Sequence, residues 1–500
     1  MSDTTTRGPV SPGTAPPDGS QPELNDLTAL PTADQIAPQG PTVLHHLAFM
    51  TGDELCIPIF KRLRQDGTLY PVDAAQRQSD DARGGQSQDT TSIGRDPIER
   101  DPIGRDPFER DKALKIYRTM LFTRVLDERM LAAQRQGRLS FYMQCTGEEA
   151  TVIGSAAALE DDDMIMAQYR EQGALAWRGF SCDEFMNQMF GNERDYGKGR
   201  QMPIHYGSRD LHYMTISSPL ATQIPQATGY AYGQKLAGKG QCTITIFGEG
   251  AASEGDFHAA LNMASVHRVP CIFLCRNNGY AISTPSCEQF AADGIAPRAF
   301  GYHMQSIRVD GNDVIAVYEA TMAARKIAVE THQPVLIEAM TYRLAAHSSS
   351  DDPSGYRSKK EEAIWRDKDP ILRMRNWLEA QGWWSEEEEK ATGDQLRREV
   401  LESMKRAEKL APPALDTLIT DVYDTPTPLL KQQLEYVKQH IRKYPHAYPK
   451  GAASMGFTAQ ELEDSRKAHQ ERLQRMQSPK PVEDHQSVES HQPVDGGQTS

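Results

Sequence analysis

The chain has 500 residues, a net charge of −14 at pH 7 and hydrophobic residues at 38% of its positions. This acidic balance argues against a general nucleic-acid-binding protein, and no apolar run is long enough to cross a membrane as a helix. Seven cysteines without a framework spacing indicate a reducing compartment. The N-terminus has neither an apolar signal core nor an Arg-rich amphipathic pattern, so we expect a cytoplasmic protein.

Low apolar content divides the chain into ordered and disordered parts. Residues 1–40, 76–110 and 476–500 hold too few apolar side chains to offset the entropy of ordering. We predict a disordered N-terminal segment, a linker and a disordered tail in these three ranges. The remaining ranges are predicted to form an N-terminal arm at 41–75, one α/β domain at 111–425 and a helical C-terminal extension at 426–475.

A five-residue repeat, "IGRDP IERDP IGRDP FERDK", runs from Ile93 to Lys112. Its period is too short for a solenoid unit, and a proline in every fifth position prevents a helix. We interpret the repeat as a solvated, charge-neutral spacer. A docking role for it is the alternative.

The elements that follow alternate between helix and strand. Residues 113–137 have helical apolar spacing and end at a glycine, and residues 220–238 predict a helix of small apolar residues. Strands are predicted at 241–247, 269–276 and 333–343, with helices between them at 253–268 and 314–330. Ser253 is the expected N-cap of the first of these two helices. Charged and amphipathic helices are predicted at 386–409 and 428–445.

The order strand, helix, strand, helix, strand indicates a parallel α/β sheet. The strand at 269–276 is continuously apolar, which is typical of a strand buried on both faces. In such sheets ligands bind at the carboxyl ends of the strands. Glu249 and Asn278 each follow a predicted strand, so we expect their side chains to meet at this edge.

Glu249 and Asn278 have the chemistry of a magnesium site. Mg²⁺ prefers about six hard oxygen ligands and often combines carboxylates with phosphate oxygens. A carboxylate, an amide oxygen and a backbone carbonyl just after the asparagines would supply half of this shell, and a diphosphate would supply part of the rest. The glycines at 248 and 250 would let the backbone approach the phosphates. The alternative is a pair of ordinary turns that link two strands.

Gly248-Glu249-Gly250, followed by residues 251–276 and then Asn277-Asn278, resembles the thiamin-diphosphate motif, with Glu in place of the commoner Asp. Seven further stretches strengthen the resemblance: "SFYMQCTGEEA", "AQYREQGAL", "GKGRQMPIHYG", "ISSPLATQIPQATG", "RNNGYAISTP", "RVDGND" and "EAMTYRLAAHSSSDDPSGYRS". Together they are similar to the α subunit of the branched-chain 2-oxo acid dehydrogenase E1 component, over roughly residues 41–75 and 111–450. The resemblance implies the thiamin-diphosphate-binding fold.

The resemblance also implies roles for individual residues. The implied magnesium ligands are Glu249, Asn278 and the carbonyl of Tyr280, and Arg170 and Arg276 are the implied diphosphate contacts. Ser218 matches a pocket residue near the reacting carbon. The other implied cofactor-binding residues are Gln168, Tyr169, Leu220, Gly248, Gly250 and Ala251, and Tyr169 is also a candidate catalytic residue. A potassium site is implied at Ser217, Pro219, Thr222 and Gln223.

His347 matches a histidine that lies over the cofactor phosphate and assists acyl transfer. Taken without the resemblance, a histidine before a serine run is more often a surface residue. The family usually has Gly-His or His-His before this serine, whereas this chain has Ala345-Ala346-His347, which leaves the ordering of the loop in doubt. Ser348 and Ser358 match positions that are phosphorylated in mitochondrial members, and we treat them as unmodified because no import signal is evident.

The resemblance implies oxidative decarboxylation of branched-chain 2-oxo acids and transfer of the acyl group to the lipoyl arm of an E2 transacylase. Thiamin diphosphate, Mg²⁺ and K⁺ are the implied cofactors. The residue that activates the cofactor and a second histidine belong to a separate β chain in this family, so we expect an α2β2 assembly. The alternatives are a pyruvate dehydrogenase E1 α subunit and a non-catalytic assembly subunit. The sequence leaves open the acid preference, the E2 partner and the role of the repeat.

Overall fold

The structure is a computed structural model that describes residues 55–70 and 107–477. Its main feature is a six-stranded sheet of order β1-β7-β8-β4-β3-β2, in which all neighbours are parallel. The strands are β1 (Ile59–Phe60), β2 (Met164–Met166), β3 (Thr243–Gly248), β4 (Cys271–Asn277), β7 (Gln305–Asp310) and β8 (Val335–Met340). A separate antiparallel pair is formed by β5 (Tyr280–Ala281) and β6 (Thr284–Pro285). The predicted parallel sheet is thus confirmed.

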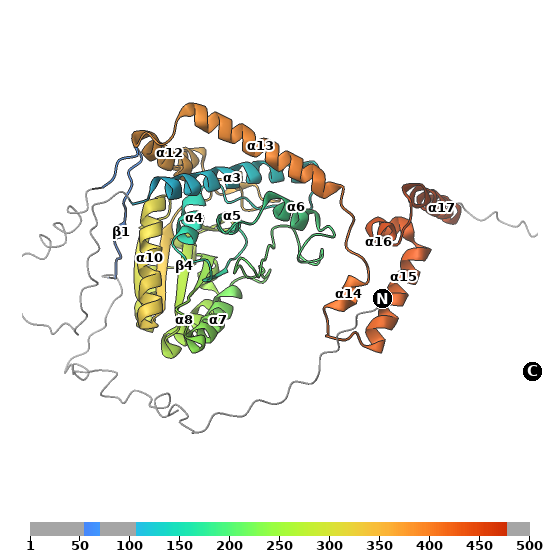
Figure 1. The fold of residues 1–500 in the computed structure, drawn as a ribbon, viewed down its shortest axis with the longest axis horizontal. Coiled ribbons are helices and arrows are strands. Elements are labelled where there is room, and N and C mark those ends of the chain that lie inside the picture. Colours follow the sequence, from blue (N-terminus) through green and yellow to red (C-terminus); the bar gives the residue numbers. More distant parts are fainter. Residues whose placement is uncertain (1–54, 71–106, 478–500) are drawn as a thin grey trace, which may run out of the picture. The chain divides into compact units, whose positions relative to one another are not determined.

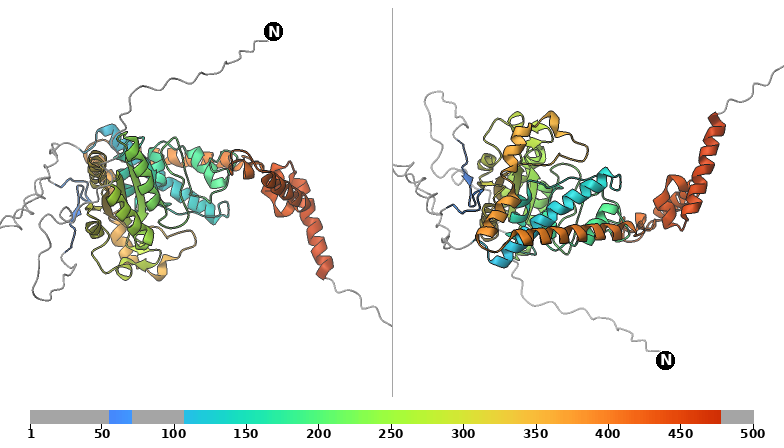
Figure 2. Two further views of the ribbon diagram at one scale, coloured as in Figure 1. Left: turned by 90° about the horizontal axis from the view of Figure 1, so that it is seen from below. Right: turned by 90° about the horizontal axis from the view of Figure 1, so that it is seen from above.

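Helices cover the sheet and form the extension at the C-terminal end of the described residues (Figure 1). They are α3 (Arg110–Arg135), α4 (Glu149–Ala157), α5 (Gln172–Trp177), α6 (Cys182–Phe190), α7 (Gln223–Ala237), α8 (Gly255–His267), α9 (Ser286–Gln289), α10 (Val314–Thr331), α11 (Lys359–Arg366), α12 (Pro370–Ala380), α13 (Glu386–Glu408), α14 (Thr417–Thr420), α15 (Pro428–Lys443), α16 (Pro449–Ser454) and α17 (Ala459–Gln477). The two longest, α3 and α13, pack against each other, as Figure 2 shows from two further sides.

Alternate side chains of each central strand enter two different cores. In β4, Ile272 and Leu274 pack in the core that includes residues of α3, α4 and α10. Phe273, between them, packs with Phe257 of α8 and Ala227 of α7 on the other face. Every residue of β4 is buried. The continuously apolar pattern of this strand follows from its burial on both faces.

Three strands of the sheet were not expected from the sequence. β1 and β2 have only two and three residues, too few for a pattern of alternation. β7, with the sequence "QSIRVD", mixes polar and apolar residues. Its Arg308 is buried because it pairs with Glu338 of β8 at 3.0 Å, and this partner cannot be identified from local sequence.

Two local predictions are corrected. Ser253 does not cap α8: it ends the 3-10 turn η2 (Ala251–Ser253), and Glu254 is the N-cap residue. Residues 93–106 of the predicted spacer lie outside the described residues, but its last part is ordered, because Phe108 is buried and α3 begins at Arg110. No proline follows Pro107 there, so the helix can form.

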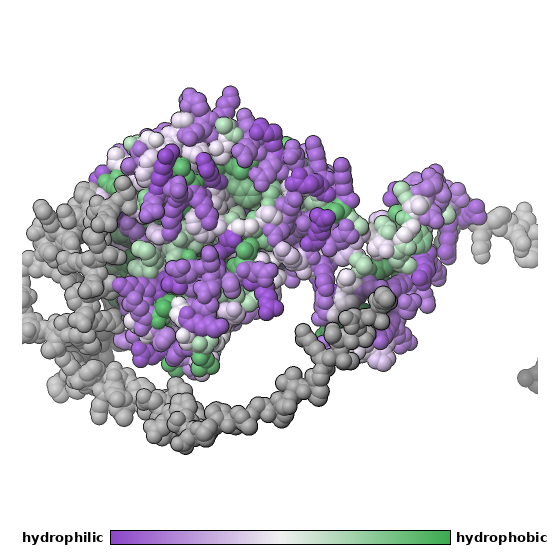
Figure 3. All heavy atoms as spheres, in the orientation of Figure 1, coloured by the Kyte–Doolittle hydropathy of each residue, from purple (hydrophilic) through white to green (hydrophobic). Residues whose placement is uncertain are grey.

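None of the helices in the described ranges is long and apolar enough to cross a membrane. The face drawn in Figure 3 is mainly hydrophilic, with hydrophobic side chains in scattered groups. The segment predicted to be disordered at 1–40 lies outside the described residues, as does the tail predicted at 476–500 apart from residues 476–477, which end α17. The division into arm, domain and extension remains a prediction.

Asp313 ties one end of α10 to the chain before α3. Its carboxylate accepts hydrogen bonds from the backbone N–H groups of Ala316 at 3.0 Å and of Arg62 and Leu63 at 2.6 Å each. Burial raises the pKa of this carboxyl above its usual value. One buried side chain therefore caps a helix and fixes the segment that carries β1.

We predict that Asp313→Ala lowers the free energy of unfolding by about 3 to 5 kcal/mol, because it leaves three buried N–H groups without an acceptor. Ser385→Ala is the matched control: Ser385 caps α13 at the surface through one bond to the Glu388 N–H, and its loss should cost about 1 kcal/mol. Chemical denaturation measures both. Equal losses of unfolding free energy in the two variants would contradict the proposal that Asp313 both caps α10 and holds the segment that carries β1.

Candidate functional site

The carboxyl ends of β3 and β4 bring Glu249 and Asn278 together, as the sequence predicts. Gly248 and Arg276 are register partners on these neighbouring strands. One carboxylate oxygen of Glu249, Oε2, accepts a hydrogen bond from the Asn278 backbone N–H at 3.3 Å. The amide oxygen of Gln168, which follows β2, accepts from the Gly248 N–H at 2.8 Å. Three adjacent strand ends therefore contribute to one cluster.

Glu249 is a buried carboxylate with spare binding capacity. It is 1% exposed, and its Oε1 atom has no hydrogen-bond partner among the described residues. Burial raises the pKa of Glu249 to about 7. A desolvated carboxylate with an unshared oxygen is a suitable ligand for a divalent cation, whose charge would stabilise the ionised form.

Two further oxygens can join Glu249 at a cation. The amide oxygen of Asn278 accepts the Tyr280 N–H at 3.2 Å, and its Nδ2 donates to Glu148 at 3.0 Å, so the side chain is held on both sides. Tyr280 begins β5, which places its carbonyl two residues after Asn278. At Gly250, a Cβ would lie only 2.8 Å from the Ala281 Cβ, so a glycine permits this close approach. The donor set fits Mg²⁺.

Arg276 lies at the same edge but is engaged by carboxylates. Its two terminal nitrogens lie 3.0 Å from Glu148 Oε1 and 2.7 Å from Glu171 Oε1, and all three side chains are buried. A phosphate contact would require Arg276 to share or exchange these partners. Its predicted role at a diphosphate stays a prediction.

Arg170 and His347 are joined by a hydrogen bond. The Arg170 guanidinium donates to the Gln144 carbonyl at 2.7 Å and also to the His347 carbonyl. The His347 ring meets the Tyr169 ring edge-on, with centroids 6.2 Å apart. These three residues were predicted as a set, and the fold brings them side by side.

The imidazole of His347 is held neutral by its surroundings. Burial, together with the positive charges of Arg170 and Arg343, lowers the pKa of His347 to about 3. Its backbone N–H donates to Asp351 at 2.7 Å, and Tyr356 donates to the same carboxylate at 2.6 Å. The loop is therefore ordered despite the two alanines before His347, and the acidic side chain that orders it was not singled out in the sequence.

Three of the four predicted potassium ligands, Ser217, Pro219 and Thr222, form a compact group. The Thr222 hydroxyl lies 2.9 Å from Ser217 Oγ and 3.0 Å from the Pro219 carbonyl oxygen. Gln223 is directed elsewhere through its amide nitrogen, which donates to the Ile246 carbonyl at 3.2 Å. Hydroxyl and carbonyl oxygens suit a hard cation. Leu220, in the same turn, is 44% exposed.

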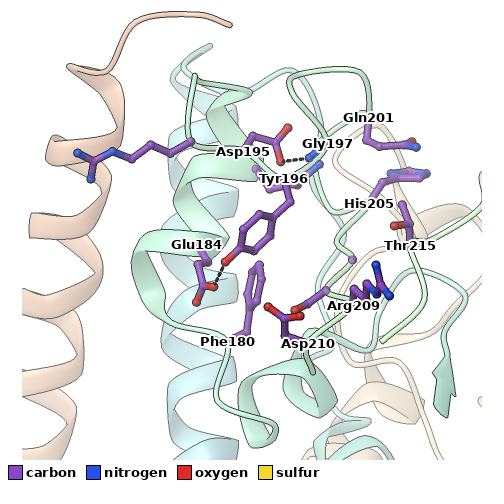
Figure 4. Close-up of a pocket in the computed structure, with 14 residues that line it drawn as sticks. Phe180, Glu184, Asp195, Tyr196, Gly197, Gln201, His205, Arg209, Asp210 and Thr215 are labelled. Atoms are coloured by element: carbon purple, nitrogen blue, oxygen red, sulfur yellow. Dashed lines mark hydrogen bonds between the residues drawn. The ribbon is translucent and has the colours of Figure 1, made fainter. Parts of the chain in front are cut away.

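The sequence reasoning missed His205 as a residue of the site. His205 is buried, and its Nε2 atom lies 2.8 Å from the Ser218 hydroxyl oxygen. The stretch "GKGRQMPIHYG" contributed to the family resemblance, but its histidine gave no signal of its own, because the contact spans thirteen positions of sequence. His205 also lines a cavity of about 250 Å³ (Figure 4) that none of the predicted residues lines.

Residues 117–415 match the family described as "Dehydrogenase E1 component". The chain is 56% identical over 340 residues to the "2-oxoisovalerate dehydrogenase subunit alpha, mitochondrial" of Dictyostelium discoideum. The matched residues make up 68% of this chain and 77% of that protein. The Homo sapiens protein of the same name is 53% identical over 339 residues. The matched residues make up 68% of this chain and 76% of the human protein. The predicted resemblance is thus confirmed.

The predicted cytoplasmic location is wrong, because these relatives are named as mitochondrial proteins. The prediction rested on the composition of the first residues, which lie outside the described residues. A targeting segment is an address read by a receptor, and its composition varies too widely to exclude one. The reason for treating Ser348 and Ser358 as unmodified fails with it.

We predict a pH-dependent effect of Glu249→Gln in the metal-free protein. Because its folded pKa of about 7 lies above the ordinary 4.5, native Glu249 contributes stability at low pH that is lost as the pH rises through 7. Gln lacks this dependence. Relative to that of the native protein, the free energy of unfolding of the variant should therefore rise by about 2 kcal/mol between pH 5 and pH 8.

Denaturation in EDTA at pH 5 and pH 8 measures this difference. Glu254→Gln is the control, since Glu254 is exposed five residues away. If native and Glu249→Gln protein differ in unfolding free energy by the same amount at both pH values, the raised pKa of the buried Glu249 carboxyl is contradicted.

Proposed function

Because the chain belongs to the dehydrogenase E1 component family, we propose that it is the α subunit of an enzyme that oxidatively decarboxylates branched-chain 2-oxo acids. The acyl group passes to the lipoyl group of an E2 transacylase. The observation that carries the proposal is the unshared carboxylate oxygen of Glu249 beside Asn278, at the strand ends of an E1 domain. The names of the relatives support the substrate class and a mitochondrial location.

Thiamin diphosphate supplies the carbon nucleophile and the electron sink that decarboxylation requires. Glu249, Asn278 and the Tyr280 carbonyl would hold Mg²⁺, and the backbone at Gly248, Gly250 and Ala251 would contact the diphosphate. The unshared oxygen of Glu249 and the close approach at Gly250 support this assignment.

The other residues of the cluster orient the cofactor and the substrate. Arg170 and Arg276 bind the diphosphate through their planar guanidinium groups. Gln168, Tyr169 and Leu220 would contact the cofactor, and Ser218 would lie at the reacting end of the pocket. A potassium ion at Ser217, Pro219, Thr222 and Gln223 stiffens the turn between them, and the close approach of the first three residues supports this.

His347 acts as a neutral hydrogen-bonding group. Its position beside Arg170 and its low pKa mean that the free imidazole carries no charge at neutral pH. A neutral ring nitrogen can accept a proton as the acyl group moves to the lipoyl arm. The negative charge of the diphosphate would favour the protonated imidazole and would therefore raise the pKa of His347 towards neutral pH.

The site is completed by a β subunit in an α2β2 assembly. Ser218, Pro219 and Leu220 are all exposed in this chain, although they are assigned to the cofactor pocket. The relatives are named as alpha subunits, which supports a partner of this kind. This chain alone is expected to be inactive.

We predict that Asn278→Ala weakens binding of thiamin diphosphate and Mg²⁺ to the assembled enzyme at least about tenfold, because one oxygen ligand is lost. Calorimetry measures the affinity. Asn262→Ala, at an exposed position of α8, is the control and should bind normally. An affinity of Asn278→Ala within twofold of the native value would count against the magnesium site.

The acid preference is tested by co-expression with a β chain and a decarboxylation assay. We expect kcat/KM for 2-oxoisovalerate to exceed that for pyruvate by about tenfold or more, the scale on which an apolar pocket distinguishes small side chains. The reverse order would support a pyruvate dehydrogenase. Absence of heat with thiamin diphosphate and Mg²⁺, even with the β chain present, would support a non-catalytic assembly subunit.

A further inference from the structure

Two loops on the cofactor side of the domain are joined so that His205 meets Ser218. Ser208 and Tyr213 exchange backbone hydrogen bonds of 2.9 Å in both directions. The Ile216 N–H then donates to the Tyr206 carbonyl at 3.1 Å. This short ladder fixes the loop that carries His205 against the turn that carries Ser218.

The hydrogen bonds of His205 determine its tautomer. Its Nδ1 lies 3.1 Å from the Pro203 carbonyl oxygen, which can only accept, so Nδ1 carries the proton. In the neutral ring Nε2 is then an acceptor. The Ser218 hydroxyl, 2.8 Å away, donates to it. The proton of Ser218 is thus held, and the remaining lone pairs of its oxygen are available to a ligand.

Both loops adopt unusual backbone conformations beside this contact. Ile204 has φ 69° and Ala221 has φ 66°, in the left-handed region that non-glycine residues rarely occupy. A Cβ at Gly207 would lie 2.2 Å from the Thr215 hydroxyl oxygen, so the loops are also closely packed. Such strain persists where the surroundings fix a geometry, and it gathers at functional sites.

We propose that His205 is a positioning residue that fixes the rotamer and proton of Ser218. This inference rests on the proposed function, which assigns Ser218 to the reacting end of the pocket. With its proton held by His205, the Ser218 oxygen accepts a hydrogen bond from a donor group and repels an anionic oxygen. Ser218 would therefore disfavour approach of the substrate carboxylate and help to set the orientation of the 2-oxo acid.

The same contacts argue against Ser218 as a nucleophile. Activation of a serine by histidine is favoured when a carboxylate stabilises the imidazolium that forms. The Nδ1 partner of His205 is a neutral carbonyl, that of Pro203. Holding the proton suits this arrangement better than removing it.

The cavity on the other side of His205 makes the residue testable by substitution. His205, Gln201 and Thr215 lie on one wall, and Glu184 and Tyr196 lie across from them (Figure 4). Ser218 is not among the residues that line this cavity. Removal of the imidazole would extend a cavity that already exists, so the fold should tolerate it.

The test uses His205→Ala, His205→Gln, Ser218→Ala and the double variant His205→Ala/Ser218→Ala in the α–β assembly. His205→Ala should lower kcat/KM for 2-oxoisovalerate about tenfold, with a larger change in kcat than in KM. His205→Gln places an amide oxygen near the position of Nε2 and should recover most of the loss. In the Ser218→Ala background, removal of His205 should change kcat/KM less than twofold.

A crystallographic measurement tests the inference without turnover. Ser218 should occupy one rotamer in the native and His205→Gln assemblies and several in His205→Ala, while the affinity for thiamin diphosphate stays within twofold. His212→Ala is the control, because His212 lies in the same loop pair and bonds a different carbonyl, that of Asp161. It should leave the Ser218 rotamer and kcat/KM unchanged.

Equal losses for His205→Ala in the native and Ser218→Ala backgrounds would overturn the inference, as would His205→Gln as impaired as His205→Ala. If His205→Ala does not assemble, the His205→Gln variant tests the inference. A single Ser218 rotamer and recovered kcat/KM in that variant would support it, and several rotamers with low kcat/KM would overturn it. If the native assembly decarboxylates no 2-oxo acid, the proposed function fails, while a Ser218 rotamer that depends on His205 would still support the contact itself.

Discussion

The burial of charge at the ends of two parallel strands is the constraint on which the rest of the site depends. Glu249, Glu148, Glu171 and Arg276 all lie in the interior, where an unpaired charge is very costly. Three of them compensate one another through the Arg276 ion pairs. Glu249 accepts a backbone N–H on one oxygen, and its other oxygen has no hydrogen-bond partner among the described residues, so it could bind the cation that we propose.

This arrangement makes one edge of the sheet suitable for an anionic ligand that binds a cation. A cation at Glu249 and the guanidinium groups of Arg170 and Arg276 would surround an anionic group from several sides. The arginines are already positioned by carbonyls and carboxylates, so little side-chain entropy remains to be lost on binding. Pre-formed hydrogen bonds of this kind favour tight and specific cofactor binding.

Around this edge, loops rather than strands carry the groups that we propose to face the substrate. His347 is fixed by Asp351 and by Arg170, and Ser218 is fixed by His205. The bond between Arg170 and His347 joins segments 177 positions apart, whereas His205 and Ser218 are 13 positions apart and His347 and Asp351 belong to one loop. The α/β scaffold therefore positions Glu249 and Asn278, and the loop contacts orient His347 and Ser218.

The meeting of Glu249 and Asn278 at one edge of the sheet could be predicted from the amino-acid sequence. The apolar run before Asn277 fixed a strand buried on both faces, and the glycines around Glu249 marked the end of its neighbour, so the meeting of Glu249 and Asn278 followed from parallel pairing alone. Tertiary structure decided the rest. β1, β2 and β7 are too short or too polar to show a pattern, and the engagement of Arg276 by Glu148 and Glu171 depends on segments over a hundred positions apart. The contact between His205 and Ser218 forms only when their two loops pack together. It could not be predicted, because a hydrogen bond between two loops produces no periodic pattern in the sequence.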